Sequence, residues 1–570
     1  MSRIGTRIGT RIGTRGSGSG GSRPSVHVLA AAVALLVPLV GIGAEPKPDA
    51  PAGSAPANPA ALAPGEMWRL DLREAVRQAV QNSLDVEILR FDPEIAEADL
   101  LAAWGSYDPQ IFGEGGHGHT EIPTASELFS VAFNETRLTD AEAGLRGLIP
   151  WVGGAYSVSY AGAETESNSN LATLSPQFTA DFLATLQVPL LRGLFWSPEW
   201  TLVRTSRIGV GVAADQFASR LMDVVRQTED AYWGLVANRD ATRVARKSLE
   251  TAQALLEQTK AQYDVGVVSK VEVVQSEAGV ADREFRLITA QAAERTQQDV
   301  LIDLVLGPYL APRSELPVEL VDKPGSIEVR EVDPEIAAEK AFSLRPELSQ
   351  LQKQIEQQEL QLRLASNQRL PQLDLQASYG NTGLSGNLSP DCVSFVVDPV
   401  TGIRQPCRSS VPTEFGDANN DFFTDDAAKN WTVRGVVSVP IGNFGARGRY
   451  DRTKFELRRT QTQLHRLQQS IVTDVRRAAR ILAASVEGIE AAERAVAAAE
   501  EQLRAERVRL EYGESTPFDV LLREDDLVTA EGQLITAHQA YQNAITALER
   551  AQGTILTRNG IVIEQAAALR

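Results

Sequence analysis

The chain has 570 residues, of which 56 are basic and 74 acidic, so that its formal net charge is −18. A polyanion repels such a chain, which excludes nucleic acid as the expected partner. Only two cysteines occur in the whole sequence, Cys392 and Cys407.

The first 44 residues have the layout of a secretory signal peptide. Five arginines, at positions 3, 7, 11, 15 and 23, precede an apolar stretch from Val26 to Val40 that ends in small residues before Ala44. Removing these five arginines leaves a net charge of about −23 on the remainder. No cysteine lies near the expected cleavage after Ala44, so no lipid anchor is expected there. Residues 45–66 are rich in proline and alanine and are predicted to form a leader without a core.

The remainder of the chain contains an internal duplication. The sequence Leu-Ile-Thr-Ala at Leu287–Ala290 returns at Leu534–Ala537, and Gly266 returns at the same offset as Gly513. Earlier in each half the offset is larger, since Pro109-Gln110 returns as Pro371-Gln372. Matches that share an offset over many positions predict two structural repeats.

The repeats and their connector set the expected domain organisation. A proline-rich connector at residues 308–332 separates a first repeat at residues 67–307 from a second repeat at residues 333–553. Residues 554–570 form a C-terminal tail. Each repeat is expected to contain a helix, strands with long polar loops, a very long helix, a tight turn and a further helix.

Long segments without proline predict the very long helices. No proline occurs from Glu199 to Gly307 or from Ile441 to Thr516, so a helix can continue through each segment. Helices over about Trp200–Tyr263 and Arg447–Tyr512 would be roughly 95 Å long at 1.5 Å per residue. Their leucines and valines recur at spacings of three and four residues. Taken alone, these helices favour a soluble coiled coil.

The strands change that interpretation. Apolar and polar residues alternate over Phe178–Val188, Leu373–Tyr379 and Trp431–Val439, and more weakly over Gln110–Gly116. Alternation over about ten residues is typical of transmembrane β-strands. Four strands cannot close into a barrel, because the smallest membrane barrels have about eight, so several chains must pool their strands.

A further alternating segment, Leu145–Tyr160, predicts a hairpin that turns at Pro150–Gly154. The pattern does not fix its place relative to the four strands. An insertion near the barrel is one interpretation.

Several motifs carry a specific resemblance. They are Ser-Leu-Arg-Pro-Glu-Leu at Ser343–Leu348, Leu-Pro-Gln-Leu at Leu370–Leu373, and the Val-Pro strand exits at Val188 and Val439. In this order the chain resembles the TolC-like outer-membrane efflux family over about residues 68–553. The resemblance implies a mostly α fold with a membrane β-barrel, built from a duplicated helix–strand–long helix–helix repeat. It further implies a homotrimer with twelve strands in the cell outer membrane, spanning the periplasm, with a periplasmic adaptor and an inner-membrane pump as partners.

The same resemblance assigns roles to the two turns that follow the long helices. They read Gly266, Val267, Val268, Ser269 and Gly513, Glu514, Ser515, Thr516. Glycine permits a tight reversal and a hydroxyl three residues later can cap the next helix, so both turns are expected to be tips that contact the adaptor. A turn without any partner is the alternative, since every helical hairpin needs one.

Asp519 follows the second turn and matches the aspartate that narrows the channel entrance in this family. Threefold symmetry would make it a ring of carboxylates that attracts cations and whose mutual repulsion raises their pKa. Glu272 occupies the equivalent site of the first repeat and is expected to reinforce this pore gate. The alternative role is that of an acidic helix cap or dipole partner.

Both cysteines fall between two membrane-type strands, in the Asn381–Asn430 segment. We expect a disulfide between Cys392 and Cys407 in an extracellular loop, worth about 3 kcal/mol in the chain-entropy model. Two free thiols are the alternative, which an oxidising compartment disfavours.

No motif predicts an enzyme or a cofactor. His117-Gly118-His119 could bind a metal, but no carboxylate or thiol has suitable ligand spacing. Asp417, Asn419 and Asp421 resemble part of a calcium loop that lacks its glycine and its final glutamate. Phosphate-binding, nucleophile-elbow and zinc-helix motifs are absent from the sequence. Energy for transport would therefore come from a partner.

The expected function is a passive trimeric duct of a tripartite efflux or type I secretion system. The alternative from another class is a structural or adhesive trimer, a surface coiled coil anchored by a barrel, without a transport role. Such an anchor normally lies at one end of a chain, whereas here strands interrupt both repeats. The cargo cannot be read from the sequence.

Overall fold

The computed structural model describes most of the two repeats. The predicted signal peptide and leader lie outside the described residues, as do parts of the connector and of the C-terminal tail. The described residues are 68–124, 132–307, 318–323, 332–390, 392, 394, 396–407, 413–422 and 428–563.

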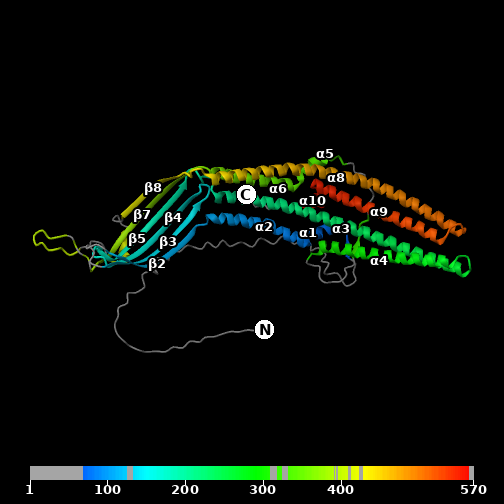
Figure 1. Ribbon diagram of the computed structural model, residues 1–570, viewed down its shortest axis with the longest axis horizontal. Coiled ribbons are helices and arrows are strands. Elements are labelled where there is room, and N and C mark those ends of the chain that lie inside the picture. The colour runs from blue at the N-terminus through cyan, green and yellow to red at the C-terminus, as the bar shows by residue number, and fades with distance from the viewer. Residues whose placement is uncertain are drawn as a thin grey trace, which may run out of the picture.

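The molecule is elongated, with a sheet at one end and helices over the rest of its length (Figure 1). The first half contains β1 (Trp68–Leu70), α1 (Leu72–Asn82), α2 (Leu84–Trp104), a short 3-10 turn (Gly105–Tyr107), β2 (Gln110–Pro123), β3 (Phe133–Ile149), β4 (Gly154–Ser167), β5 (Leu174–Pro189), α3 (Pro198–Asp264) and α4 (Lys270–Leu306). The second contains β6 (Val318–Leu320), α5 (Pro334–Leu344), α6 (Pro346–Asn367), β7 (Gln372–Leu388), α7 (Phe415–Phe422), β8 (Ala428–Ser438), α8 (Phe444–Glu511), α9 (Pro517–Gln552) and α10 (Ile555–Arg558).

The two predicted long helices are present as α3, with 67 residues, and α8, with 68. Each is about 100 Å long at 1.5 Å per residue. Ser197 caps α3 by accepting a hydrogen bond from the Trp200 N–H, and Pro198 occupies the first helical turn, where its missing N–H costs nothing. Among the described residues, no helix combines the length and the apolar character needed to cross a membrane.

Over the described residues, the sheet has six antiparallel strands in the order β2-β3-β4-β5-β7-β8. The expected count of four was therefore wrong. The predicted hairpin at Leu145–Tyr160 forms the end of β3 and the start of β4. Both strands lie inside the sheet, between β2 and β5. The alternation predicted this hairpin but did not show which strands it pairs with, so the predicted count of four did not include it.

The register sorts the side chains of the sheet onto two chemically different faces. On one face apolar residues lie side by side across the strands, such as Tyr160 beside Phe182 of β5. On the other, Ser157 and Thr185 share a hydrogen bond of 2.7 Å. The apolar face includes exposed side chains from all six strands: Ile111, Leu145, Val158, Leu186, Leu375, Tyr379, Trp431, Val433 and Val437.

The largest core of the first repeat surrounds the short parallel pair β1 and β6. Tyr232 of α3 is fully buried there. Its hydroxyl donates to Asp322 at 2.8 Å and lies 3.2 Å from the Leu70 carbonyl. Burial raises the pKa of Tyr232 well above its ordinary value. β6 belongs to the predicted connector, so the connector ties the second repeat to the core of the first.

Equivalent glycines close a helix corner in each half. Gly307 ends α4 with a positive φ, and a Cβ there would collide with the Asn82 carbonyl at the end of α1. Gly553 ends α9 in the same way, and a Cβ there would lie 3.1 Å from the Leu344 carbonyl at the end of α5. Both positions require glycine because the backbones approach so closely.

The Ser343–Leu348 motif forms the corner between α5 and α6, and an ion cluster holds it in place. The Arg550 guanidinium of α9 contacts Glu347 at 2.8 Å and Asp223 of α3 at 2.8 Å. Its side chain is only 12% exposed. Burial alone would raise the pKa of Glu347, but Arg550 outweighs it and lowers that pKa below its ordinary value. Through Glu347, the motif therefore takes part in an ion cluster that joins α3, α6 and α9.

We predict that Arg550→Ala lowers the free energy of unfolding by about 2 kcal/mol, because it leaves two half-buried carboxylates without their partner. Glu347 stabilises the fold while it is ionised, so the wild type should lose this contribution as pH falls below about 4.5 and the variant should not. Thermal unfolding between pH 3 and pH 7 measures both effects. Arg504→Ala, which removes an exposed pair with Glu501, is the control and should change little. Equal effects of the two variants would contradict this role of Arg550.

Candidate functional site

The two predicted tips lie at the end of the molecule opposite the sheet (Figure 1). Gly266 follows α3 and Gly513 follows α8, and both have φ of +78°. One residue later, the Val267 N–H donates to the Gln262 carbonyl at 2.9 Å and the Glu514 N–H donates to the Arg509 carbonyl at 2.8 Å. A left-handed glycine with this bond ends a helix sharply. The two repeats therefore build the same turn twice.

Both tips expose apolar side chains. Val267 is 72% exposed in the first tip and Tyr512 is 79% exposed in the second. A Cβ at either glycine would meet no atom within 4 Å. Exposed apolar groups at the end of a rod are typical of a contact surface. Further exposed apolar side chains are Tyr263, Val265, Val271 and Val274 in the first tip and Val508, Phe518 and Leu522 in the second.

Asp519 occupies the third position of α9 and forms a capping box with Thr516. The Asp519 N–H donates to the Thr516 hydroxyl at 3.2 Å, and the Asp519 carboxylate accepts from that hydroxyl at 2.7 Å and from the Thr516 N–H at 3.3 Å. These hydrogen bonds lower the pKa of Asp519 below its ordinary value. Within one chain, the acidic residue therefore caps its helix and stays ionised.

Glu272 holds the matching position in α4. Its carboxylate lies 3.4 Å from the Ser269 hydroxyl, the residue before the helix. Both candidate gate residues are partly exposed in the single chain. The two helices that carry them pack against each other.

The contact between α4 and α9 contains residues that sequence reasoning missed. Arg283 is buried and donates to the Leu521 carbonyl at 3.0 Å, and a Cβ at Gly279 would lie 2.8 Å from the Leu521 side chain. Beside them, Arg286 pairs with Asp525 at 2.6 Å. No pattern in the sequence links residues so far apart in the chain, although a glycine within the α4 helix pattern suggests close helix packing.

Glu524 is buried in the same contact, with 4% of its surface exposed. Burial raises its pKa, against the opposing charges of Arg283 and Arg507. Its equivalent in the first repeat, Glu277, is exposed and pairs with Lys260 instead. The two repeats therefore have the same turns, but the equivalent glutamates differ in their surroundings: Glu524 is buried and Glu277 is exposed.

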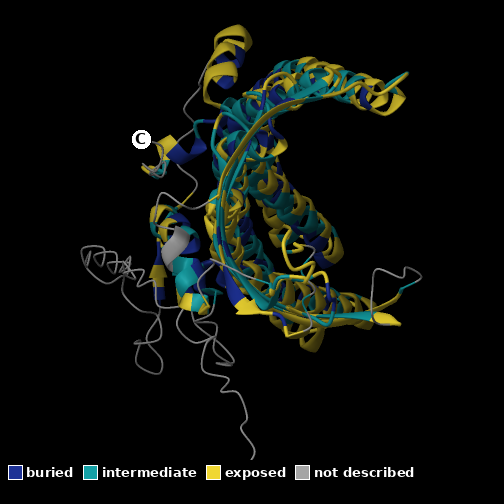
Figure 2. Ribbon diagram, turned by 90° about the vertical axis from the view of Figure 1, so that its left-hand side faces the viewer, coloured by how far each residue is buried: buried dark blue, intermediate teal, exposed yellow. Residues whose placement is uncertain are grey.

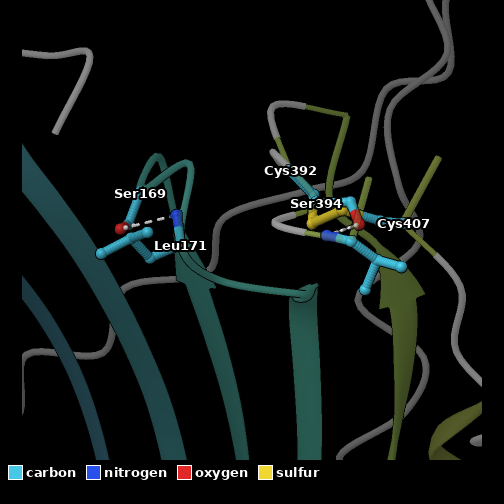
Figure 3. The surroundings of a disulfide bond; sticks show 6 residues. Ser169, Leu171, Cys392, Ser394 and Cys407 are labelled. Carbon is cyan, nitrogen blue, oxygen red and sulfur yellow. Dashed lines mark hydrogen bonds between the residues drawn. A yellow bond between two sulfur atoms is a disulfide. The ribbon is translucent and has the colours of Figure 1, made fainter. Parts of the chain in front are cut away.

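The other end of the molecule carries the cysteine loop. Cys392 and Cys407 form a disulfide close to the loop of Ser169 and Leu171 that joins β4 to β5 (Figure 3). The Ser389 N–H donates to the Thr173 carbonyl at 2.9 Å and ties the two loops together. In the expected arrangement the tips lie in the periplasm. The cysteine loop lies at the opposite end of the molecule, and we propose that this end is extracellular.

The calcium-like segment is helical. Asp417 and Asn419 belong to α7, which packs on the sheet through Phe415 and Phe178, whose ring centroids are 5.9 Å apart. Asn419 accepts a hydrogen bond of 2.8 Å from the Tyr160 hydroxyl. A helix cannot wrap an ion as a calcium loop does.

The two histidines of β2 have other partners. His117 contacts the Thr139 hydroxyl at 2.9 Å and His119 contacts Glu121 at 3.0 Å. Within the described residues, no group of three or more metal-ligating side chains is assembled.

Comparison with known proteins agrees with this geometry. Residues 139–307 and 337–554 match the family model described as outer membrane efflux protein. The chain belongs to the outer membrane efflux protein family. Its place is therefore the outer membrane, with helices that span the periplasm, and it is a passive channel protein and not an enzyme.

Individual members of the family are distant from this chain in sequence. It is 23% identical to the outer membrane protein TolC of Escherichia coli (strain K12) over 434 residues, which cover 74% of this chain and 77% of TolC. Solved structures of outer-membrane channels share its fold, OprN and CmeC among them. The outer-membrane channel OprN superposes with a TM-score of 0.60 at 14% identity and covers 85% of this chain and 90% of its own. The Campylobacter jejuni CmeC outer membrane channel has a TM-score of 0.57 at 15% identity, with 85% of each chain covered.

Proposed function

We propose that three copies of the chain form a passive duct from the periplasm to the cell exterior, in an efflux or type I secretion system. A periplasmic adaptor binds its tips, and an inner-membrane pump supplies the energy. One observation carries the proposal: the sheet and the long helices follow a single curved wall, open on one side, when viewed along the long axis (Figure 2). A curved open wall becomes a tube when copies are arranged around its axis.

The two lateral edges of the wall have opposite charge. One edge is formed by α2, whose exposed charged residues are acidic apart from Arg90. The other is formed by the first half of α8, whose exposed charged residues are basic apart from Asp451. When copies surround one axis, α2 of one copy meets α8 of the next, and opposite charges favour that contact. The acidic set is Asp85, Glu87, Asp92, Glu94, Glu97 and Asp99, and the basic set is Arg447, Arg449, Arg452, Arg458, Arg459, Arg466, Arg476 and Arg477.

The α2 edge also has an apolar stripe that the single chain leaves exposed. Ile88, Phe91 and Ile95 are 63%, 51% and 57% exposed and follow each other at spacings of three and four residues. Such spacing is typical of a helix that packs against another helix. Burial of this stripe against α8 of the next copy would stabilise the same contact that the opposite charges favour.

The exposed tips support the role of the turns in binding the adaptor. Their apolar side chains lie at the periplasmic end, where a partner protein can reach them. Burial of a side chain such as Val267 contributes about 1.5–3 kcal/mol to a complex.

We predict that Gly266→Trp abolishes export while trimers remain in the outer membrane, because the bulky ring blocks the adaptor at an open tip. Gly402→Trp is the matched control, since Gly402 also has a positive φ and open surroundings but lies in the cysteine loop at the other end. Dye efflux from cells that depend on this chain measures export, and native gels measure trimers. Export that survives in Gly266→Trp would show that the adaptor does not bind there.

A ring of three Asp519 carboxylates, reinforced by Glu272, is our proposed gate at the narrow end of the duct. Within one chain, hydrogen bonds with Thr516 lower the pKa of Asp519 below its ordinary value, which opposes the rise that mutual repulsion in the ring would cause. Three fixed negative charges in a narrow passage bind multivalent cations. An adhesive trimer with a closed anchor would have no such passage.

We predict stepwise conductance of the purified protein in planar bilayers, with block by a multivalent cation that weakens at least tenfold in Asp519→Ala. Thr516→Ala is the matched control, because it removes the helix cap but keeps the carboxylate. It should lower stability by about 1 kcal/mol and leave the block unchanged. If both variants weaken the block equally, Asp519 acts only as a cap. If the protein gives no open-channel steps even in Asp519→Ala, the duct itself is ruled out.

A further inference from the structure

We propose that the hairpin β3–β4 is part of the membrane-spanning wall, so that the assembled channel has an eighteen-stranded barrel. The count follows from six strands in each of three copies and rests on the trimer proposed above. A resemblance to TolC-like proteins alone implies twelve. The hairpin would thus widen the outer-membrane part of the duct by half.

The first support is the continuity of the sheet. β3 pairs with β2 from Phe133 to Arg146 without interruption, and β4 pairs with β5 from Ala155 to Thr165. In the described part of the sheet, β2 and β5 are not paired with each other. A hairpin lying outside the membrane would break both ladders and leave β2 and β5 with unpaired backbone groups, which the hydrocarbon core does not tolerate.

The second support is the alternation of side chains along the hairpin. Tyr156 and Val158 of β4 lie opposite Leu186 and Ala184 of β5, and Leu145 of β3 lies opposite Val158. Near its turn, the hairpin therefore continues the apolar face of the transmembrane strands. At its other end the same face carries the Arg137–Glu166 ion pair and is contacted by Phe415 of α7. The other face stays polar, as the Ser157–Thr185 and Arg146–Gln110 hydrogen bonds show. Apolar residues facing lipid and polar residues facing the lumen are the signature of a membrane barrel strand.

The third support is the position of the hairpin turn. A Cβ at Gly153 would lie 2.7 Å from the Gly193 carbonyl, so the turn packs tightly against the segment that leads from β5 into α3. The Trp151 ring lies 6.1 Å from Trp200 at the start of α3, and Trp200 lies 5.8 Å from Trp104 at the end of α2. The turn therefore contacts the ends of two helices. Aromatic side chains at this level suit the interface between membrane and water.

The fourth support is the width of the wall. At the sheet end, α3 packs between α2 and α6, and α6 packs against α8. Four helices at about 9–10 Å spacing occupy an arc of about 36–40 Å. Six strands at about 4.8 Å spacing and about 40° tilt occupy about 38 Å, whereas four occupy about 25 Å. The hairpin thus gives the sheet the same width as the helical wall below it.

The extra strands have a consequence for passage. Three such sheets give a circumference of about 113 Å and a backbone diameter of about 36 Å, against about 24 Å for twelve strands. The barrel then continues the bore of the helical tube without a constriction. The helical tips become the part of the duct that limits the size of the cargo.

Electron cryomicroscopy of the full-length protein in lipid nanodiscs tests the strand count directly. The expected image is a threefold particle with eighteen strands around the barrel. A threefold particle with twelve strands and the hairpin outside the wall would overturn the inference and leave the proposed duct intact. A particle without threefold symmetry would overturn both.

Cysteine labelling of membranes provides a second measurement that does not depend on particle images. Val158→Cys should react with a lipid-soluble maleimide and Ser157→Cys with a water-soluble one that enters through the lumen. Leu186→Cys and Thr185→Cys on β5 are the matched controls for the two faces, and the native cysteines are protected in their disulfide. Equal labelling of Val158→Cys and Ser157→Cys by the water-soluble reagent would contradict a place in the membrane wall.

Discussion

The structure depends on one constraint, the need of every strand edge for a hydrogen-bonding partner. Within the described part of the chain, four strands of the sheet are paired on both sides, whereas β2 and β8 each have a neighbour on one side only. In lipid no water can satisfy the remaining backbone groups. The chain therefore carries two open strand edges, and in the trimer that we propose further copies of the same chain complete the wall by symmetry.

This constraint extends into the helices. α2, α3, α6 and α8 lead directly into or out of β2, β5, β7 and β8, so the width of the sheet and the width of the helical wall must agree. In the proposed trimer, the acidic α2 edge and the basic α8 edge bring together the same copies whose strand edges pair. At the far end the two hairpins converge on contacts such as Arg286–Asp525, which hold the two tips of one chain together.

The sequence predicted those features whose cause is local. Absence of proline marked α3 and α8, alternation marked β5, and glycine marked the turns at Gly266 and Gly513. The place of the 145–160 hairpin could not be predicted, because strand order depends on pairing between distant segments. The same holds for Arg283, which donates to the Leu521 carbonyl of the other repeat, and for Glu524, on which the Arg283 charge acts. The spacing of Asp417, Asn419 and Asp421 resembled that of calcium ligands. The sequence did not show that this segment forms the helix α7, because Asn419 bonds to Tyr160 of a distant strand.

The central claim is that β2 and β8 are interior strands of a closed wall. Hydrogen–deuterium exchange of the native particle, read by mass spectrometry of peptides from each strand, tests this claim most directly. The account predicts that amides of β2 (Gln110–Pro123) and β8 (Ala428–Ser438) exchange as slowly as those of β5, which is paired on both sides. Fast exchange in β2 and β8 beside a protected β5 would mean that the sheet edges are open, and would contradict the closed duct.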